Sequence, residues 1–117
     1  MSNYKEGNLQ ITLKEGAKNV LTWTGKSDDR DPSALLNPFF DQIMDKLKNK
    51  ELDIEFAKLE YMNSSSVPPI IQLIKKLNSN GVKTVITYDK ESKWQSASFK
   101  ALETIFRTMD NIEVVGK

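Results

Sequence analysis

The sequence predicts a single α/β domain built on a mixed, mostly parallel sheet. Apolar and β-branched runs alternate along the chain with segments of helical periodicity, and Gly, Pro, Asn or Asp residues separate them. Strands that alternate with helices favour parallel pairing, whereas two early strands joined by a short gap favour a hairpin. The predicted order is β-β-α-β-α-β-α-β, and one domain is expected to span residues 1–117.

Five strands are predicted from alternation or from β-branched content. The second follows the first after a break at Glu15-Gly16, and the third is expected to end near Glu60-Tyr61. The fourth is almost wholly apolar or β-branched, which is typical of an inner strand. The predicted strands are residues 8–13, 20–24, 52–61, 82–88 and 112–115.

Three helices are predicted from apolar residues at helical spacing. The first is expected to start with Asn37 as the N-cap and Pro38 in the first helical position. The second follows Pro68-Pro69, which fit only in a first turn, and ends at Asn80-Gly81. In the third, Trp94 is interpreted as a core residue, with a partner interface as the alternative. The apolar face of the first helix is expected in the core and comprises Phe39, Phe40, Ile43, Met44 and Leu47.

Composition excludes several classes of function. The chain has neither cysteine nor histidine, so disulfides, thiolate catalysis and Ser-His-Asp systems are excluded, and no metal or other cofactor is expected. With 17 basic and 16 acidic residues, the net charge of +1 offers no broad attraction for nucleic acid. No signal peptide or membrane-spanning run is recognisable, so a cytoplasmic protein is expected.

The candidate functional segment is Leu59–Ser66, which joins the end of the third strand to the start of the second helix. In open α/β sheets, functional groups gather beyond the carboxyl ends of strands, and a helix N-terminus favours an anion. A phosphate on a serine here would be stabilised and would add nearly two negative charges to the surface. The alternative interpretation is that these serines are ordinary helix N-caps.

The chain from Leu52 to about Val115 resembles the STAS domain of bacterial anti-sigma-factor antagonists. The resemblance rests on a strand, an apolar–Met–Asp–Ser–Ser–Gly motif, an apolar helix, a glycine, an apolar strand and a further helix. Here the motif is Tyr61–Ser66, and Gly81 and Val82–Tyr88 follow the helix. Trp23–Asp28 takes the place of the family's strand that ends in Gly-x-x-Asp. The polar start of the third helix is more similar to a cyanobacterial and proteobacterial branch of STAS-like regulators.

The resemblance implies a protein-binding switch controlled by phosphorylation. The matching phosphoacceptor is Ser64, with Ser65 and Ser66 as less favoured candidates; Asn63 replaces the family's Asp, and Ser66 replaces its Gly. The implied partners are a serine protein kinase or anti-sigma factor and a phosphatase of the PP2C type. The expected partner-binding residues are Gly25, Lys26, Asp28, Asn63, Ser64, Ser65, Ser66 and Pro68.

Two other functions are considered beside the switch. One is a STAS adaptor that is never phosphorylated, in a signalling or lipid-transport complex, and the changes at Asn63 and Ser66 favour this version. The other is an enzyme, which the sequence disfavours because no motif with catalytic chemistry is present. A receiver-like phosphoacceptor is excluded because Asn63 stands where an aspartate is needed. Carboxylates that an enzyme could use are Asp28, Asp29, Asp31, Glu60 and Asp89.

Overall fold

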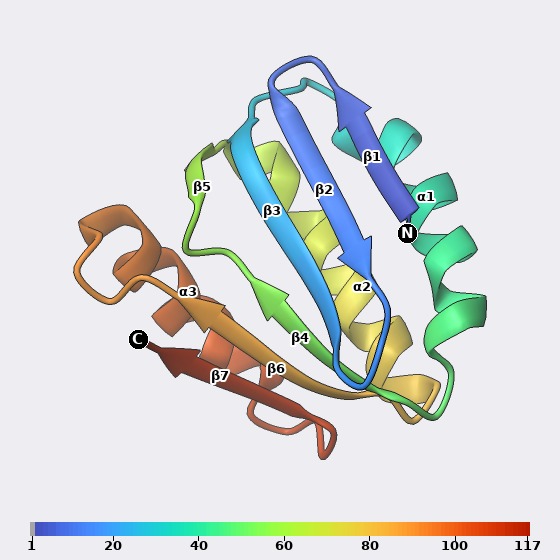
Figure 1. Ribbon diagram of the computed structural model, residues 1–117. Helices are drawn as coiled ribbons and strands as arrows, with labels where there is room; N and C mark the ends of the chain where they lie inside the picture. Colours follow the sequence, from blue (N-terminus) through green and yellow to red (C-terminus); the bar gives the residue numbers. More distant parts are fainter. Residues whose placement is uncertain (1) are drawn as a thin grey trace.

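The computed structural model describes residues 2–117, which form one seven-stranded sheet and three α-helices (Figure 1). The sheet order is β1-β2-β3-β4-β6-β7, with β5 also paired to β3. The first three strands are antiparallel and all other pairs are parallel, so the predicted fold class is confirmed. In chain order the elements are β1 (Ser2–Glu6), β2 (Leu9–Lys14), β3 (Asn19–Ser27), α1 (Pro32–Leu47), β4 (Glu51–Glu55), β5 (Leu59–Met62), the 3-10 helix η1 (Ser64–Ser66), α2 (Val67–Ser79), β6 (Lys83–Tyr88), α3 (Lys93–Phe106) and β7 (Ile112–Gly116).

Three strands depart from the prediction. Strand β3 continues through Gly25 to Ser27, three residues beyond its predicted end at Thr24, because Gly25 adopts a positive φ without leaving the sheet. Strand β1 was missed because its polar sequence, SNYKE, buries only two side chains, Ser2 and Tyr4. The predicted third strand is two strands, since a turn closed by the Leu59 amide on the Phe56 carbonyl (2.9 Å) separates β4 from β5. Both halves stay beside β3, β4 along its first residues and β5 along its last.

Helix α1 begins six residues earlier than predicted. Its N-cap is Asp31 and Pro32 lies in its first turn, so Asn37 is not the N-cap and Pro38 lies inside the helix. A proline there removes the hydrogen bond to the carbonyl four residues back, that of Ala34. Both residues are exposed, so water can bind that carbonyl, and the helix continues through Pro38. Its apolar face is buried as predicted.

The other helix boundaries follow the sequence closely. Pro68 and Pro69 lie in the first turn of α2, and Gly81 follows its end with φ +68°. Helix α3 begins after Ser92, whose hydroxyl accepts a hydrogen bond from the Gln95 amide at 3.5 Å. Trp94 is half-buried and packs against the core. It is therefore neither a fully buried core residue nor a fully exposed interface residue.

All three helices cover one face of the sheet, as Figure 1 shows. Trp23 is at the centre of the core, with its ring centroid 6.0 Å from that of Phe40 on α1 and 5.0 Å from that of Phe56. Phe56 in turn lies 4.7 Å from Phe99 of α3. This aromatic chain links α1, the sheet and α3 in one core. Among residues 2–117, no helix has both the length and the apolar content needed to cross a bilayer.

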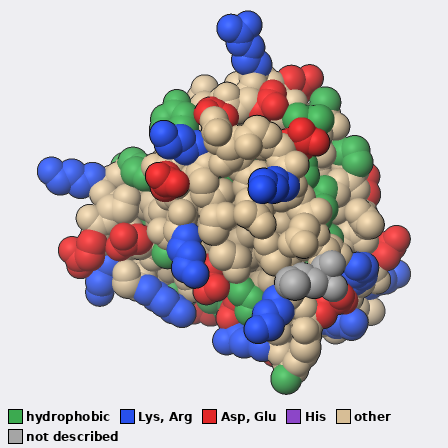
Figure 2. All heavy atoms as spheres, turned by 45° about the horizontal axis from the view of Figure 1, so that its top comes forward, with side chains coloured by type: hydrophobic (Ala, Val, Ile, Leu, Met, Phe, Trp, Pro, Cys, Tyr) green, Lys and Arg blue, Asp and Glu red, His purple; other side chains and the backbone are tan. Residues whose placement is uncertain are grey.

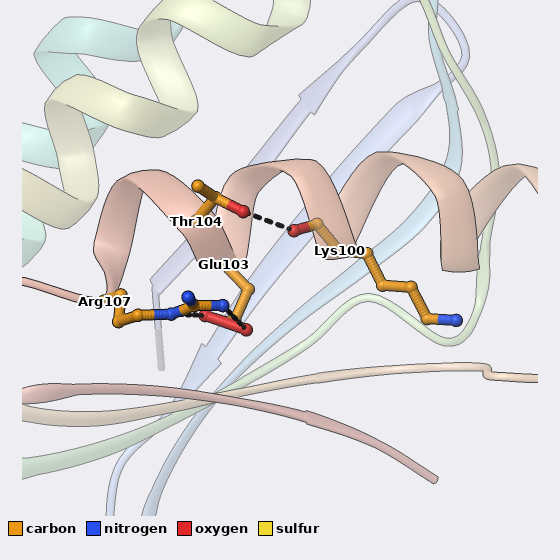
Figure 3. Close-up of polar contacts among 4 residues, drawn as sticks. All are labelled: Lys100, Glu103, Thr104 and Arg107. Carbon is orange, nitrogen blue, oxygen red and sulfur yellow. Dashed lines mark hydrogen bonds and ion pairs between the residues drawn. The ribbon is translucent and has the colours of Figure 1, made fainter.

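An ion pair on α3 leads to a prediction about pH. Arg107 donates to both carboxylate oxygens of Glu103, at 3.0 and 2.9 Å, one helical turn away (Figure 3). These bonds lower the pKa of Glu103 and raise that of Arg107. Because the folded pKa of Glu103 lies below its unfolded value, its contribution to stability is present above the unfolded pKa, about 4.3, and is lost at lower pH.

We therefore expect Glu103→Gln to lower the melting temperature slightly at pH 7 and to have no effect near pH 3. Thermal unfolding followed by circular dichroism across that range measures the difference. Glu60→Gln is the control, because Glu60 forms no ion pair within residues 2–117. A Glu103→Gln deficit that persists unchanged at pH 3 would contradict the assignment.

Candidate functional site

The predicted site residues lie together at the carboxyl ends of β3 and β5. These strands are parallel, so Ser27 pairs with Met62, and the Asn63 amide donates to the Ser27 carbonyl at 2.9 Å. Both strands end at the top of Figure 1, where η1 and α2 begin. We call this region the serine edge; its residues are Gly25, Lys26, Asp28, Asn63, Ser64, Ser65, Ser66 and Pro68.

Asn63 connects the two loops of the serine edge. Its Oδ1 accepts hydrogen bonds from the Ser66 amide at 3.0 Å and the Ser66 hydroxyl at 2.6 Å. Its Nδ2 donates to the Asp29 carbonyl at 2.8 Å, in the loop before α1. An aspartate could accept the first two bonds but, when ionised, has no hydrogen to donate to Asp29. The Asn in place of the family's Asp therefore supplies a donor that this fold uses.

Asn63→Asp should therefore destabilise the protein by about 1–2 kcal/mol at pH 7, because the Asp29 carbonyl loses its donor and faces a carboxylate. Urea unfolding measures the loss. Asn37→Asp is the matched control, since Asn37 is exposed and its side chain forms no hydrogen bond within residues 2–117. Equal stability of the Asn63→Asp and Asn37→Asp proteins would show that the bond to Asp29 contributes little.

Ser66 is a structural residue. It is fully buried, and its Oγ lies 2.5 Å from the buried Ser27 Oγ, which can donate to it while Ser66 donates to Asn63. The Ser27 carbonyl lies 3.2 Å from the same Ser66 oxygen. A kinase could not reach this hydroxyl without opening the edge.

Ser64 and Ser65 differ from Ser66 in both exposure and bonding. Both are exposed, and neither side chain forms a hydrogen bond within residues 2–117. The N-cap side chain of η1 is that of Asn63, and Ser66, the N-cap residue of α2, makes no side-chain cap bond. The interpretation of the serines as N-caps therefore holds only for the position of Ser66, because no serine side chain makes a capping bond. Ser64 and Ser65 present their hydroxyls to solvent at a helix start.

Gly25 gives β3 the shape that the serine edge requires. Its φ is +84°, and a Cβ built on it would lie 2.0 Å from the Asn8 carbonyl oxygen. The next amide, that of Lys26, donates to that same oxygen at 2.9 Å. The pairing of β3 with β5 shifts register at this point. Gly25 therefore allows the close approach of β3 to Asn8 at the point where its pairing with β5 changes register.

Sequence reasoning missed Gln95, the residue that holds β5 in place. Its Nε2 donates to the carbonyls of Phe56 and Leu59, both at 2.9 Å, and its Oε1 accepts from the Asp89 amide at 2.7 Å. The side chain is buried. Gln95 thus fixes the break between β4 and β5, and with it the start of the strand that leads to Ser64. The spacing of Gln95 in the helix does not distinguish it from a glutamine on the surface, so its burial could not be predicted from the sequence.

Ser27 and Asn8 were also missed, and Asp29 was named only as a carboxylate that an enzyme could use. The alternation of β3 places Ser27 on the buried face, a signal that was available in the sequence. Asn8 donates to the Asp28 carboxylate at 3.1 Å, a contact between loops 20 residues apart that periodicity does not show. Burial, with the nearby charges of Glu6 and Asp29, raises the pKa of Tyr4 beside this edge.

The surface around the serine edge is mixed in charge and partly apolar. Figure 2 brings the upper end of Figure 1 forward and shows acidic and basic side chains interspersed with uncharged ones. Tyr61 of β5 is 49% exposed, and Leu35, in the first turn of α1, is 39% exposed. Helix α1 packs beside η1.

The carboxylates considered for an enzyme have local roles. Asp29 accepts from the Asp31 amide at 3.0 Å, and Asp89 accepts from the Glu91 amide at 2.9 Å, so both cap turns. Within residues 2–117 there is no group of three or more Asp, Glu, His or Cys side chains placed to hold a metal. A hollow of about 630 Å³ lies at the other end of the parallel strands, around the first residues of β4, β6 and β7.

Comparison with known proteins identifies the family. Residues 10–95 match the model of the SiaC family regulatory phosphoproteins, which is most of the chain. No curated protein matches the chain as a relative.

Solved structures share the fold at low identity. A chain from the crystal structure of diguanylate cyclase SiaD in complex with its activator SiaC from Pseudomonas aeruginosa is 14% identical, with a TM-score of 0.72 and full coverage of both chains. An anti-sigma factor antagonist from Mycobacterium paratuberculosis is 11% identical, with a TM-score of 0.64 over 90% of this chain and 85% of that one. A DUF3478 family protein with a SpoIIAA-like fold from Shewanella loihica is 14% identical, with a TM-score of 0.57 over 98% and 90%.

These structures confirm the predicted resemblance to anti-sigma-factor antagonists at the level of the fold. The family match covers Gly25, β5, η1 and α2, and so includes the whole serine edge. The chain belongs to the SiaC family of regulatory phosphoproteins.

Proposed function

We propose that this protein is a non-enzymatic regulator, one domain over residues 1–117, that binds a partner protein through the serine edge until Ser64 is phosphorylated. The observation that carries the proposal is the contrast among three adjacent serines: Ser66 is buried and bonded, whereas Ser64 and Ser65 are exposed. Ser64 directly follows Asn63, whose bonds fix the loop. We assign the phosphate to Ser64, because it matches the family's first serine after the motif's Asp.

The charges around the serine edge support a switch in which a phosphate weakens partner binding. Lys26 and Arg30 are exposed near Ser64, but so are Asp28, Asp29 and Asp31. A phosphate on Ser64 would add nearly two negative charges to this mixed surface and would need desolvation when a partner covers Tyr61 and Leu35. Phosphorylation should therefore weaken docking.

We propose a diguanylate cyclase of the SiaD type as the regulated partner. In Pseudomonas aeruginosa, SiaC is the activator found in complex with that cyclase. A serine kinase would add the phosphate in the cytoplasm, and a PP2C-type phosphatase would remove it. An anti-sigma factor that is itself the kinase is the alternative partner, supported by the shared fold of the antagonist.

The test is binding of the SiaD-type cyclase from the same organism, measured by biolayer interferometry with wild type, Ser64→Ala, Ser64→Asp and Ser65→Asp. We expect Ser64→Ala to bind like wild type and Ser64→Asp to bind at least about tenfold more weakly, a difference of about 1.4 kcal/mol. Ser65→Asp is the matched control, with the same charge one residue away.

Three results would overturn parts of the proposal. If Ser64→Asp binds as tightly as wild type, the protein is an adaptor without a phosphoswitch. If Ser65→Asp alone loses binding, the phosphoacceptor is Ser65. If wild type does not bind the cyclase but retains a serine kinase or anti-sigma factor, the partner is wrong although the switch remains.

A further inference from the structure

Within residues 2–117, no strand pairs with the outer edge of β7, and the strand contains no proline. It is the last strand of the sheet order, and its apolar side chains Ile112, Val114 and Val115 are only half-buried. Edge strands are normally blocked by proline, bulges or a covering element. The opposite edge strand, β1, is accompanied by α1, since Lys46 donates to the Ser2 hydroxyl at 2.6 Å and Tyr4 lies 5.7 Å from Phe39.

The hydrogen-bond pattern shows which groups of β7 point outward. The Thr84 amide donates to the Asn111 carbonyl, and the Lys117 amide donates to the Tyr88 carbonyl. Because backbone groups alternate in direction along a strand, the odd-numbered residues from 111 to 117 face β6. The N–H and C=O groups of Ile112, Val114 and Gly116 therefore point away from the sheet.

We propose that β7 pairs with β7 of a second copy, antiparallel and with the twofold axis at Val114. Val114 then lies opposite its equivalent, and Ile112 lies opposite Gly116 of the second copy. Each of these hydrogen-bonded pairs exchanges two bonds, about six in all, and every outward backbone group from Ile112 to Gly116 is used. Two seven-stranded sheets become one continuous sheet.

Side chains on both faces of β7 fit this self-pairing. On the helix face, a groove of about 230 Å³ is lined by the apolar side chains of Phe106, Ile112 and Val114 and by the charged residues Glu103, Arg107 and Glu113. Ile112 and Val114 of a second copy would cover its apolar part. Gly116 has no side chain, which leaves room for the opposing Ile112. On the open face, Glu113 lies opposite Val115 of the second copy and is diagonal to both Lys117 and Glu113 of that copy, so one attractive and one repulsive contact lie within reach.

Sedimentation equilibrium between about 10 µM and 1 mM tests the proposal, a range suited to a weak dimer. Wild type should rise from 13.3 kDa toward twice that mass. Val114→Pro should remain a monomer at all concentrations. Its lost N–H points away from β6, so circular dichroism should show an intact fold. A monomeric wild type would overturn the proposal, as would a Val114→Pro dimer as tight as wild type.

Crosslinking gives a second readout that depends on the register. The chain has no cysteine, so Val114→Cys carries a single thiol. Opposed Cα atoms in a hydrogen-bonded pair lie about 5.5 Å apart, which a disulfide can span. Mild oxidation should yield a covalent dimer for Val114→Cys and little for Ser65→Cys, an exposed thiol on another edge. Equal crosslinking of both variants would contradict the register. This inference does not depend on the partner or phosphosite proposed above.

Discussion

Gly25→Ala is expected to destabilise the protein by about 3 kcal/mol, the largest effect of any single glycine substitution here. The left-handed φ of +84° costs a side-chain-bearing residue about 1–2 kcal/mol. The new Cβ would also meet the Asn8 carbonyl oxygen at 2.0 Å, so the backbone of one strand end must move. Because the Lys26 amide binds that same oxygen, the serine edge should lose its shape as well.

Gly7→Ala is the matched control for Gly25→Ala. Gly7 lies between β1 and β2 with φ +56°, and a Cβ there would have no atom within 4 Å. Gly7→Ala should lower the free energy of unfolding only by the cost of a positive φ, about 1 kcal/mol. Urea denaturation of both variants separates the two contributions. Equal losses would mean that the contact with Asn8 relaxes at little cost, and the role assigned to Gly25 would then be wrong.

Gln95→Leu should destabilise the protein by about 3 kcal/mol. The substitution keeps the size of the side chain but leaves the Phe56 and Leu59 carbonyls and the Asp89 amide without the partner that Gln95 provides. Each buried polar group left unpaired costs about 1–3 kcal/mol, offset in part by local rearrangement. The break between β4 and β5 should open, and hydrogen exchange at the Asp89 amide should become faster.

Gln72→Leu controls for the change of residue type, because Gln72 is an exposed residue of α2. Its effect should stay within about 0.5 kcal/mol. If Gln95→Leu unfolds at the same urea concentration as Gln72→Leu, the three bonds of Gln95 contribute no net stability. A selective loss of cyclase binding by Gln95→Leu, at a temperature where it is folded, would show that β5 transmits the disturbance to the serine edge.

Patterns of period two and 3.6 predicted most of the fold, because burial on one face leaves such patterns directly in the chain. Phe40 and Ile43 mark the core side of α1 without reference to any other element. The start of α1 was misplaced because Asn37-Pro38 has the local chemistry of a helix start, and only exposure of that side of the helix lets it continue.

The candidate site was located from the sequence, but its internal bonding was not. A strand followed by serines and a helix places Ser64 at a sheet edge through local order alone. The bonds of Asn63 to Asp29 and of Ser66 to Ser27 join segments 34 and 39 residues apart. The periodicity of the sequence does not predict hydrogen bonds between such distant residues. The role of Gln95 could not be predicted either, because its helical position does not show whether a glutamine is buried or exposed.

The burial of Ser66 has a consequence for how a kinase distinguishes neighbouring hydroxyls. In an extended peptide of residues 60–69, Ser64, Ser65 and Ser66 are chemically alike, and a kinase acting on it would rely on sequence preference alone. In the folded protein, the Ser66 hydroxyl is buried and hydrogen-bonded to the Ser27 hydroxyl, so it is not accessible to a kinase. A kinase acting on the folded protein would thus find only Ser64 and Ser65 exposed, and phosphate on Ser66 would indicate a molecule in which the serine edge had opened.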